Sequence, residues 1–153
     1  MMSMVSAMLF LALTSPPNPP TSAPSLAWAL AADAPAYRIA GGKAVVRMVH
    51  EGPNYMGILE AYPGVKVPEH MHEKSAELLY VLEGAGEMVV DGKRTPVKTG
   101  HMIQVPPGVK HSFSIPKESS GRFVAVQVYA PAGPEQRFKK GHRITAAPAK
   151  RTQ

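Results

Sequence analysis

Three side chains that bind metals well lie close together in the middle of the chain. His70 and His72 are two residues apart, and Glu77 follows five residues after the second histidine. Side chains alternate between the two faces of a β-strand, so both imidazoles are expected to point the same way. Glu77 opens the next apolar run and can aim at the same point if the two strands are neighbours. Two imidazoles and one carboxylate that converge suit a divalent ion of iron, manganese, nickel or zinc.

A fourth candidate ligand, His111, follows a Pro-Pro-Gly turn and begins another alternating run. Three imidazoles and one carboxylate leave one or two coordination positions for water, oxygen or substrate. Such open positions distinguish a catalytic metal site from a closed structural one. Each residue taken singly has an ordinary alternative: a structural histidine at a turn, two exposed strand histidines and a surface carboxylate.

The spacing of these residues resembles the two motifs of the cupin family. The first motif reads Gly, five residues, His-x-His, three or four residues, Glu, six residues, Gly, and it is matched by Gly64, His70, His72, Glu77 and Gly84. The second reads Gly, five residues, Pro-x-Gly, two residues, His, three residues, Asn, and it is matched by Gly100, Pro106, Gly108 and His111. Ile115 stands where the family has Asn, a position that is not a ligand in the family pattern. A match at so many fixed places is far more specific than a single short motif.

The resemblance extends over about residues 41–134 and implies a particular fold and site. The fold would be a small jelly-roll β-barrel, also called a double-stranded β-helix, with one divalent metal ion inside its mouth. The implied ligands are His70, His72, Glu77 and His111. The chain has no cysteine, so nitrogen and oxygen must supply every ligand.

Short apolar runs separated by Gly and Pro turns independently predict an all-β domain. The expected strands cover residues 37–40, 43–50, 55–62, 65–67 leading into the two histidines, 77–82, 86–90, 93–95, 102–105, 111–115 and 122–129. Asp91-Gly92 predicts a tight hairpin. At 153 residues the chain is expected to hold one domain, residues 37–134, with a leader at 1–32 and a basic tail at 135–153.

The leader, residues 1–32, has two apolar runs around a Pro/Ser stretch and resembles a secretory signal with an Ala-x-Ala-like end. We therefore expect an exported protein, periplasmic or secreted. The absence of Lys or Arg before Arg38 favours the alternative, a cytoplasmic protein with a disordered leader. Both apolar runs are too short for a stable membrane span of about twenty residues.

The net charge of +6 comes from the end of the chain. Six cations follow Glu135 with no further acid: Arg137, Lys139, Lys140, Arg143, Lys150 and Arg151. Such a tail could touch anionic lipid, polysaccharide or nucleic acid. Without aromatic interleaving or a recognition motif, we favour a solvated tail with no nucleic-acid partner. A short helical turn is expected at residues 135–140.

Alternation also predicts what surrounds the metal. Leu79 and Val81 share a face with Glu77, and Phe113 and Ile115 share a face with His111. If these faces point inward they form an apolar cup for a small molecule with a chelating end; the alternative is ordinary barrel core. Further candidate pocket residues are Glu60, Tyr62 and Gln127. The remaining histidines, His50, His101 and His142, are expected at the surface.

Three functions are compatible with these features. The resemblance implies a metal-dependent enzyme, with quercetin-dioxygenase-like oxygenases, decarboxylases and isomerases as its models. The alternative is a non-enzymatic module that binds a small ligand or a metal. A third role is assembly, because the family often forms homodimers through edge strands, and closing exposed edges gives a physical motive. Fold alone does not decide among them.

Overall fold

The computed structural model describes residues 30–144. Most of the predicted leader, residues 1–29, and the last part of the predicted tail, residues 145–153, lie outside these residues. The described part is a β structure with three short 3-10 helices, so the all-β prediction is confirmed. None of the helices between residues 30 and 144 has the length and apolar character needed to span a membrane.

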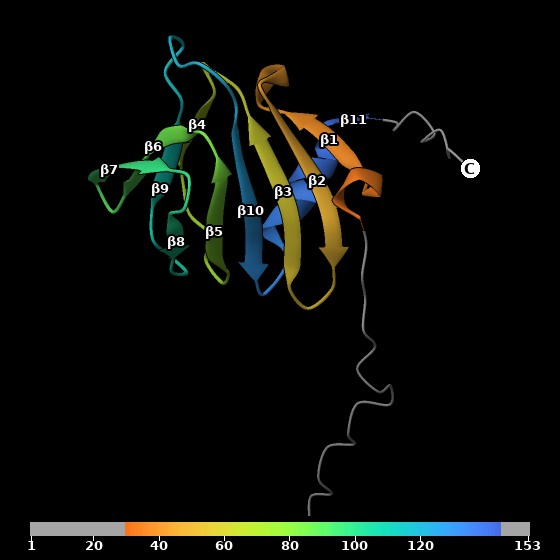
Figure 1. The fold of residues 1–153 in the computed structure, drawn as a ribbon. Helices are drawn as coiled ribbons and strands as arrows, with labels where there is room; N and C mark the ends of the chain where they lie inside the picture. The colour runs from red at the N-terminus through yellow and green to blue at the C-terminus, as the bar shows by residue number, and fades with distance from the viewer. Residues whose placement is uncertain (1–29, 145–153) are drawn as a thin grey trace, which may run out of the picture.

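The larger of two antiparallel sheets contains seven strands in the order β11-β1-β2-β3-β10-β5-β8 (Figure 1). Their bounds are β1 Ala36–Ile39, β2 Ala44–Glu51, β3 Tyr55–Ala61, β5 Ala76–Glu83, β8 Met102–Val105, β10 Phe123–Ala130 and β11 His142–Ile144. All but β11 were predicted from the sequence, with small differences at the ends. Side chains of this sheet form one wall of the interior.

The smaller sheet contains four strands in the order β4-β9-β6-β7. Their bounds are β4 Lys66–His70, β6 Ala85–Val90, β7 Lys93–Lys98 and β9 His111–Ser114. Strands β6 and β7 are joined at Asp91 and Gly92, whose φ angles of 47° and 73° are both positive, as a type I′ hairpin requires. The hairpin predicted from the Asp-Gly pair is therefore confirmed.

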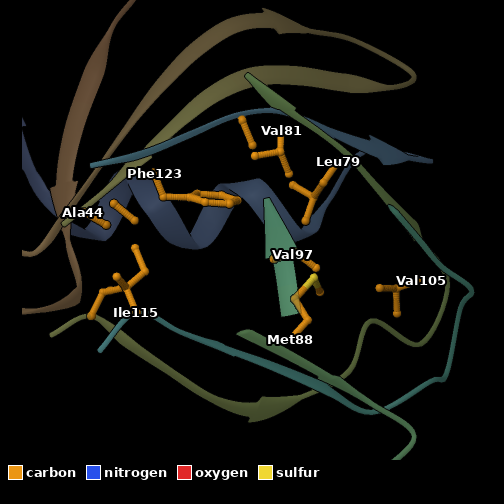
Figure 2. Close-up of a cluster of buried hydrophobic side chains, with 11 residues drawn as sticks. Ala44, Leu79, Val81, Met88, Val97, Val105, Ile115 and Phe123 are labelled. Carbon is orange, nitrogen blue, oxygen red and sulfur yellow. The ribbon is translucent and has the colours of Figure 1, made fainter. Parts of the chain in front are cut away.

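The hydrophobic core fills the space between the two sheets. Figure 2 shows Leu79 and Phe123 of the larger sheet pointing into the same interior as Met88 and Val97 of the smaller sheet. All four side chains are buried. This packing holds the two sheets face to face in the jelly-roll arrangement.

A second buried cluster attaches the end of the chain to the larger sheet. Helix η3, Pro134–Lys140, inserts Phe138 beside Tyr55 and Tyr129, whose rings stack with centroids 5.6 Å apart. In Figure 1, η3 is the blue coil behind the larger sheet. The short helical turn predicted at residues 135–140 is confirmed.

The predicted division between domain and tail at residue 135 is wrong. Phe138 is buried, and the fully buried Glu135 accepts a hydrogen bond from the Gly133 N–H at 2.6 Å. Beyond η3, strand β11 pairs with β1, with Ile144 opposite Ala36. Residues 135–144 therefore belong to the fold. The fold also begins before residue 37, because Ala34 and Ala36 are buried.

Gly84, the last residue of the first motif, is confined by the backbone at the start of β10. Its φ is +80°, and a Cβ there would overlap the Arg122 carbonyl and lie 3.0 Å from Phe123 Cα. Gly92 has a similar φ of +73°, but a Cβ there would meet nothing within 4 Å. The two glycines have similar φ angles and differ in the space available to a Cβ atom.

We predict that Gly84→Ala lowers the free energy of unfolding by at least about 2 kcal/mol, because left-handed strain and a backbone overlap add. The matched variant Gly92→Ala should lose about 1 kcal/mol, from strain alone. Urea denaturation measures both values. Equal losses in the two variants would contradict this account of Gly84.

Candidate metal centre

The four predicted ligands gather at one point. His70, His72, Glu77 and His111 each offer a ligand atom, and these atoms all lie within 4.8 Å of one another. His70 ends β4 and lies opposite His111, the first residue of β9, in the smaller sheet. Their ring centroids are 4.2 Å apart.

Glu77 reaches the histidines from the other sheet. It lies on β5 of the larger sheet, whereas His70 and His111 belong to the smaller one. The condition stated from the sequence, that the strands of Glu77 and the His-x-His pair be neighbours, is not met. The carboxylate instead approaches across the interior between the facing sheets.

His72 is positioned by a turn and not by a strand. Strand β4 ends at His70, so the expected alternation along one strand does not direct the second imidazole. The carbonyl of His72 accepts a hydrogen bond from the Gly108 N–H at 2.9 Å. That bond joins the His-x-His segment to the Pro-Pro-Gly turn before His111, and the His72 and His111 ring centroids lie 5.1 Å apart.

Two backbone carbonyls define which imidazole nitrogens are free to bind a cation. Nδ1 of His70 donates to the Pro68 carbonyl and Nδ1 of His111 donates to the Val109 carbonyl, both at 2.9 Å. A carbonyl oxygen only accepts, so each Nδ1 carries the proton and each neutral ring has its lone pair on Nε2. Nε2 of His70 is buried and has no hydrogen-bond partner among residues 30–144.

The Glu77 carboxylate faces two of these nitrogens. Its Oε2 lies 3.0 Å from Nε2 of His111 and 3.3 Å from Nε2 of His72. A carboxylate oxygen and the Nε2 of neutral His111 are both acceptors, so a proton or a metal ion must lie between them. A metal ion would also satisfy the orphaned Nε2 of His70, so this donor set fits a divalent cation.

The pKa values reflect the same arrangement. Burial alone would raise the pKa of Glu77, but hydrogen bonds with His111, His72 and Gln127 outweigh it and hold the pKa well below its usual range. Burial opposes charge on His111, yet the Glu77 hydrogen bond and the Val109 carbonyl raise its pKa. Burial is also the main cause of the lowered pKa of His70, which keeps that ring neutral and able to bind a metal.

A cavity of about 340 Å³ adjoins the cluster and is lined by Glu77 and His111. Among the predicted pocket residues, Leu79, Phe113 and Gln127 line it. Val81 and Ile115 lie deeper and pack in the hydrophobic core instead.

Glu60 and Tyr62 lie outside the cavity, so the pocket role predicted for them is wrong. Glu60 is on the outer face of β3, where its carboxylate pairs with Arg47 at 3.4 Å and Arg122 at 3.3 Å. The Tyr62 hydroxyl donates to Glu60 at 3.4 Å. The inward face of β3 carries the alternate residues, among them Leu59, which lines the cavity.

The remaining histidines lie away from the cluster. His142 is exposed as predicted, whereas His50 and His101 are partly buried. Nδ1 of His101 accepts a hydrogen bond from the Lys98 N–H at 3.3 Å, which accounts for its place at the turn.

Sequence analysis missed Arg137, which lines the cavity from helix η3. It was assigned to a solvated tail because cations dominate that segment. The one available indication was Phe138, a lone aromatic residue in a polar stretch, whose burial brings the neighbouring arginine to the site.

Gln127 orients the carboxylate. Its Nε2 donates to Glu77 Oε1 at 2.7 Å and to the Tyr129 hydroxyl at 2.9 Å, and its side chain is buried. Residues that orient metal ligands typically affect affinity by 10- to 100-fold. We predict that Gln127→Met, similar in volume but unable to donate, lowers zinc or nickel affinity by roughly tenfold or more. Competition with a chromogenic chelator measures it.

The matched control is Gln104→Met on the exposed side of β8, which should leave metal affinity unchanged. Unchanged affinity in Gln127→Met as well would show that this hydrogen bond does not support the site.

Comparisons with known proteins agree with this geometry. The sequence model of the cupin domain family matches residues 57–127 of this chain. The chain is 32% identical over 95 residues to polyketide synthase CurC of Streptomyces cyaneus, a match covering 62% of this chain and 59% of that protein. It is 30% identical over 94 residues to the oxalate-binding protein of Thermotoga maritima, covering 56% and 78%. The chain spans 51% to 62% of the length of three curated relatives, CurC among them.

Solved structures show the same fold. A cupin described as RmlC-like from Shewanella frigidimarina superposes with a TM-score of 0.63 at 21% identity, covering 73% of this chain and 96% of that one. The polyketide cyclase RemF from Streptomyces resistomycificus gives 0.61 at 22% identity, covering 72% and 82%. With the motif residues gathered at one point of a jelly roll, the chain belongs to the cupin superfamily.

Proposed function

We propose that the four-residue cluster holds one divalent metal ion and that the protein is a mononuclear metal-dependent enzyme acting on a small chelating organic molecule. Oxygenase-type chemistry is the first candidate. One observation carries the proposal: three imidazoles and one carboxylate converge within 4.8 Å beside an apolar cavity of about 340 Å³. A cavity of this size suits a small organic ligand.

Iron, manganese, nickel or zinc bound by His70, His72, Glu77 and His111 would supply Lewis acidity toward a chelating oxygen. The protein's own residues would do the rest. Leu79, Phe113 and Phe123 line the cavity and exclude water from one side of the cluster. Gln127 holds the Glu77 carboxylate in place.

The relatives support two kinds of ligand. Similarity to a polyketide synthase and a polyketide cyclase favours substrates with several carbonyl groups, such as β-diketones. Similarity to an oxalate-binding protein favours the second candidate function, a non-enzymatic module that binds a small chelating acid. The apolar cavity walls favour a substrate with more hydrocarbon than oxalate has.

The homodimer predicted from exposed strand edges stays a proposal. Strand β8 is an edge of the larger sheet, and its Met102 is exposed together with Leu78 and Tyr80 of the neighbouring strand β5. An unpaired edge with apolar neighbours supports pairing with a second copy, which sedimentation velocity tests. Export likewise stays a prediction, because it depends on residues 1–29.

Turnover distinguishes the candidate functions. We predict that the protein, loaded with each metal in turn, consumes oxygen with at least one member of a panel of diketones, flavonols and phenolic acids. His111→Ala, loaded in the same way, should show no consumption above the free metal. An oxygen electrode and chromatography of the products measure the result.

The other outcomes separate the alternatives. A product formed without oxygen would replace the oxygenase by Lewis-acid chemistry such as isomerisation or cyclisation. Saturable binding with no product across the panel would support the binding module and contradict the enzyme.

A further inference from the structure

Arg137 places a positive charge at the cavity beside the candidate ligands. It lies on η3, next to the buried Phe138, and lines the same cavity as Glu77 and His111. Its guanidinium carbon lies 5.0 Å from the Phe138 ring centroid and 5.8 Å from that of Tyr129. Nη2 donates to the Tyr129 hydroxyl at 3.1 Å. The side chain is therefore held at this place by the second hydrophobic cluster.

The charge on Arg137 has no carboxylate partner among residues 30–144. The ion pairs of that part of the chain involve other cations, including Lys139 on the same helix, which pairs with Glu51 at 2.6 Å. Beyond the Tyr129 hydroxyl, the only other side-chain hydrogen-bond contact of Arg137 within residues 30–144 is the ring nitrogen Nδ1 of His72, at 3.5 Å. A guanidinium has five N–H donors in a planar fork, so most of its donors remain available.

Binding of a metal by His72 would free a further donor. The nitrogen that faces Glu77 is Nε2 of His72, at 3.3 Å. A neutral imidazole that binds a cation through Nε2 carries its proton on Nδ1. Nδ1 is then a donor and can no longer accept a hydrogen bond from Arg137. The guanidinium would need another acceptor, and the cavity is where a ligand could supply one.

We infer that Arg137 binds an anionic group of the small molecule, set apart from the end that chelates the metal. The inference rests on the proposed function and deepens it by naming the substrate class. Arg137 contacts Nδ1 of the His72 ring, whereas Glu77 contacts Nε2 of the same ring. The anionic group bound by Arg137 therefore lies next to the metal ligands and does not itself bind the metal. The substrate class is an organic acid whose carboxylate and chelating oxygens are separated by an apolar body, which fits the apolar walls.

The other polar groups of the cavity leave this role to Arg137. Glu77 and His111 belong to the ligand cluster, and Gln127 is engaged by Glu77 and Tyr129. The one other cation that lines the cavity is Lys66 on β4, and it is exposed as Arg137 is, so the two differ in the shape of their charged groups and not in exposure. A planar fork recognises a carboxylate with two parallel hydrogen bonds, which a lysine cannot offer.

Protocatechuate and its primary amide are matched probes, since both have a catechol to chelate the metal and only the acid has a remote carboxylate. The whole 153-residue chain is loaded with zinc, which has no redox chemistry, or with nickel if zinc does not bind. Calorimetry measures the affinity for each probe, and mass spectrometry measures the metal per chain. We expect wild type to prefer the acid by about tenfold or more, the strength of a charge-assisted pair.

Arg137→Gln should bind the same amount of metal but lose the preference to within about twofold, and Arg137→Lys should keep part of it. The matched control Lys66→Gln should keep the full preference. A preference that survives in Arg137→Gln, or that disappears in Lys66→Gln, would overturn the inference while leaving the metal site intact. Failure of metal-loaded wild type to bind either probe would also overturn it. A wild-type protein that holds neither zinc nor nickel would overturn the proposed function itself. Circular dichroism confirms that each variant is folded.

Discussion

The candidate site depends on the lone pairs of imidazole nitrogens and of a carboxylate oxygen, which face one another in the protein interior. The carbonyls of Pro68 and Val109 take the Nδ1 protons of His70 and His111, so both rings present Nε2 toward the interior. The Glu77 carboxylate arrives there from the opposite sheet. Acceptors brought this close are unfavourable without a cation, and a divalent metal ion satisfies all of them at once. The same constraint explains why the ligands must be held by the fold and not only by their spacing.

The jelly roll meets this constraint by closing two sheets over one core. The register that puts His70 opposite His111 and the hydrogen bond from Gly108 to His72 join the two motifs. Packing between the sheets then fixes the distance of Glu77 from the histidines. On the other side, η3 brings Arg137 to the same cavity because Phe138 is buried against Tyr129. The candidate metal ligands and the cation beside them thus depend on two separate hydrophobic clusters.

Much of the fold and of the candidate site could be predicted from the sequence, because the alternation of apolar and polar residues, the turn residues and the motif spacing are local properties. The strands, the Asp91-Gly92 hairpin and the gathering of the four ligands belong to this class. Which strands share a sheet is not local, so the sequence could not show that Glu77 crosses between sheets. The polarity of a residue also did not indicate whether its side chain points into the barrel or out of it. Glu60 pairs with two arginines outside the barrel, whereas Gln127 is buried at the ligand cluster. The many cations of residues 135–144 favoured the prediction of a solvated tail. These residues instead pack on the domain, where Phe138 is buried.

The central claim is that His70, His72, Glu77 and His111 bind one metal ion together. Metal content, measured by plasma mass spectrometry on the full chain purified without a polyhistidine tag, tests it most directly beside the double variant His70→Ala/His72→Ala. The account predicts about one divalent ion per wild-type chain and almost none in the variant, since each lost ligand weakens the site and two imidazoles supply half of the donors. A wild-type protein that stays metal-free after reloading with iron, manganese, nickel or zinc would contradict the account. So would a variant that keeps its metal.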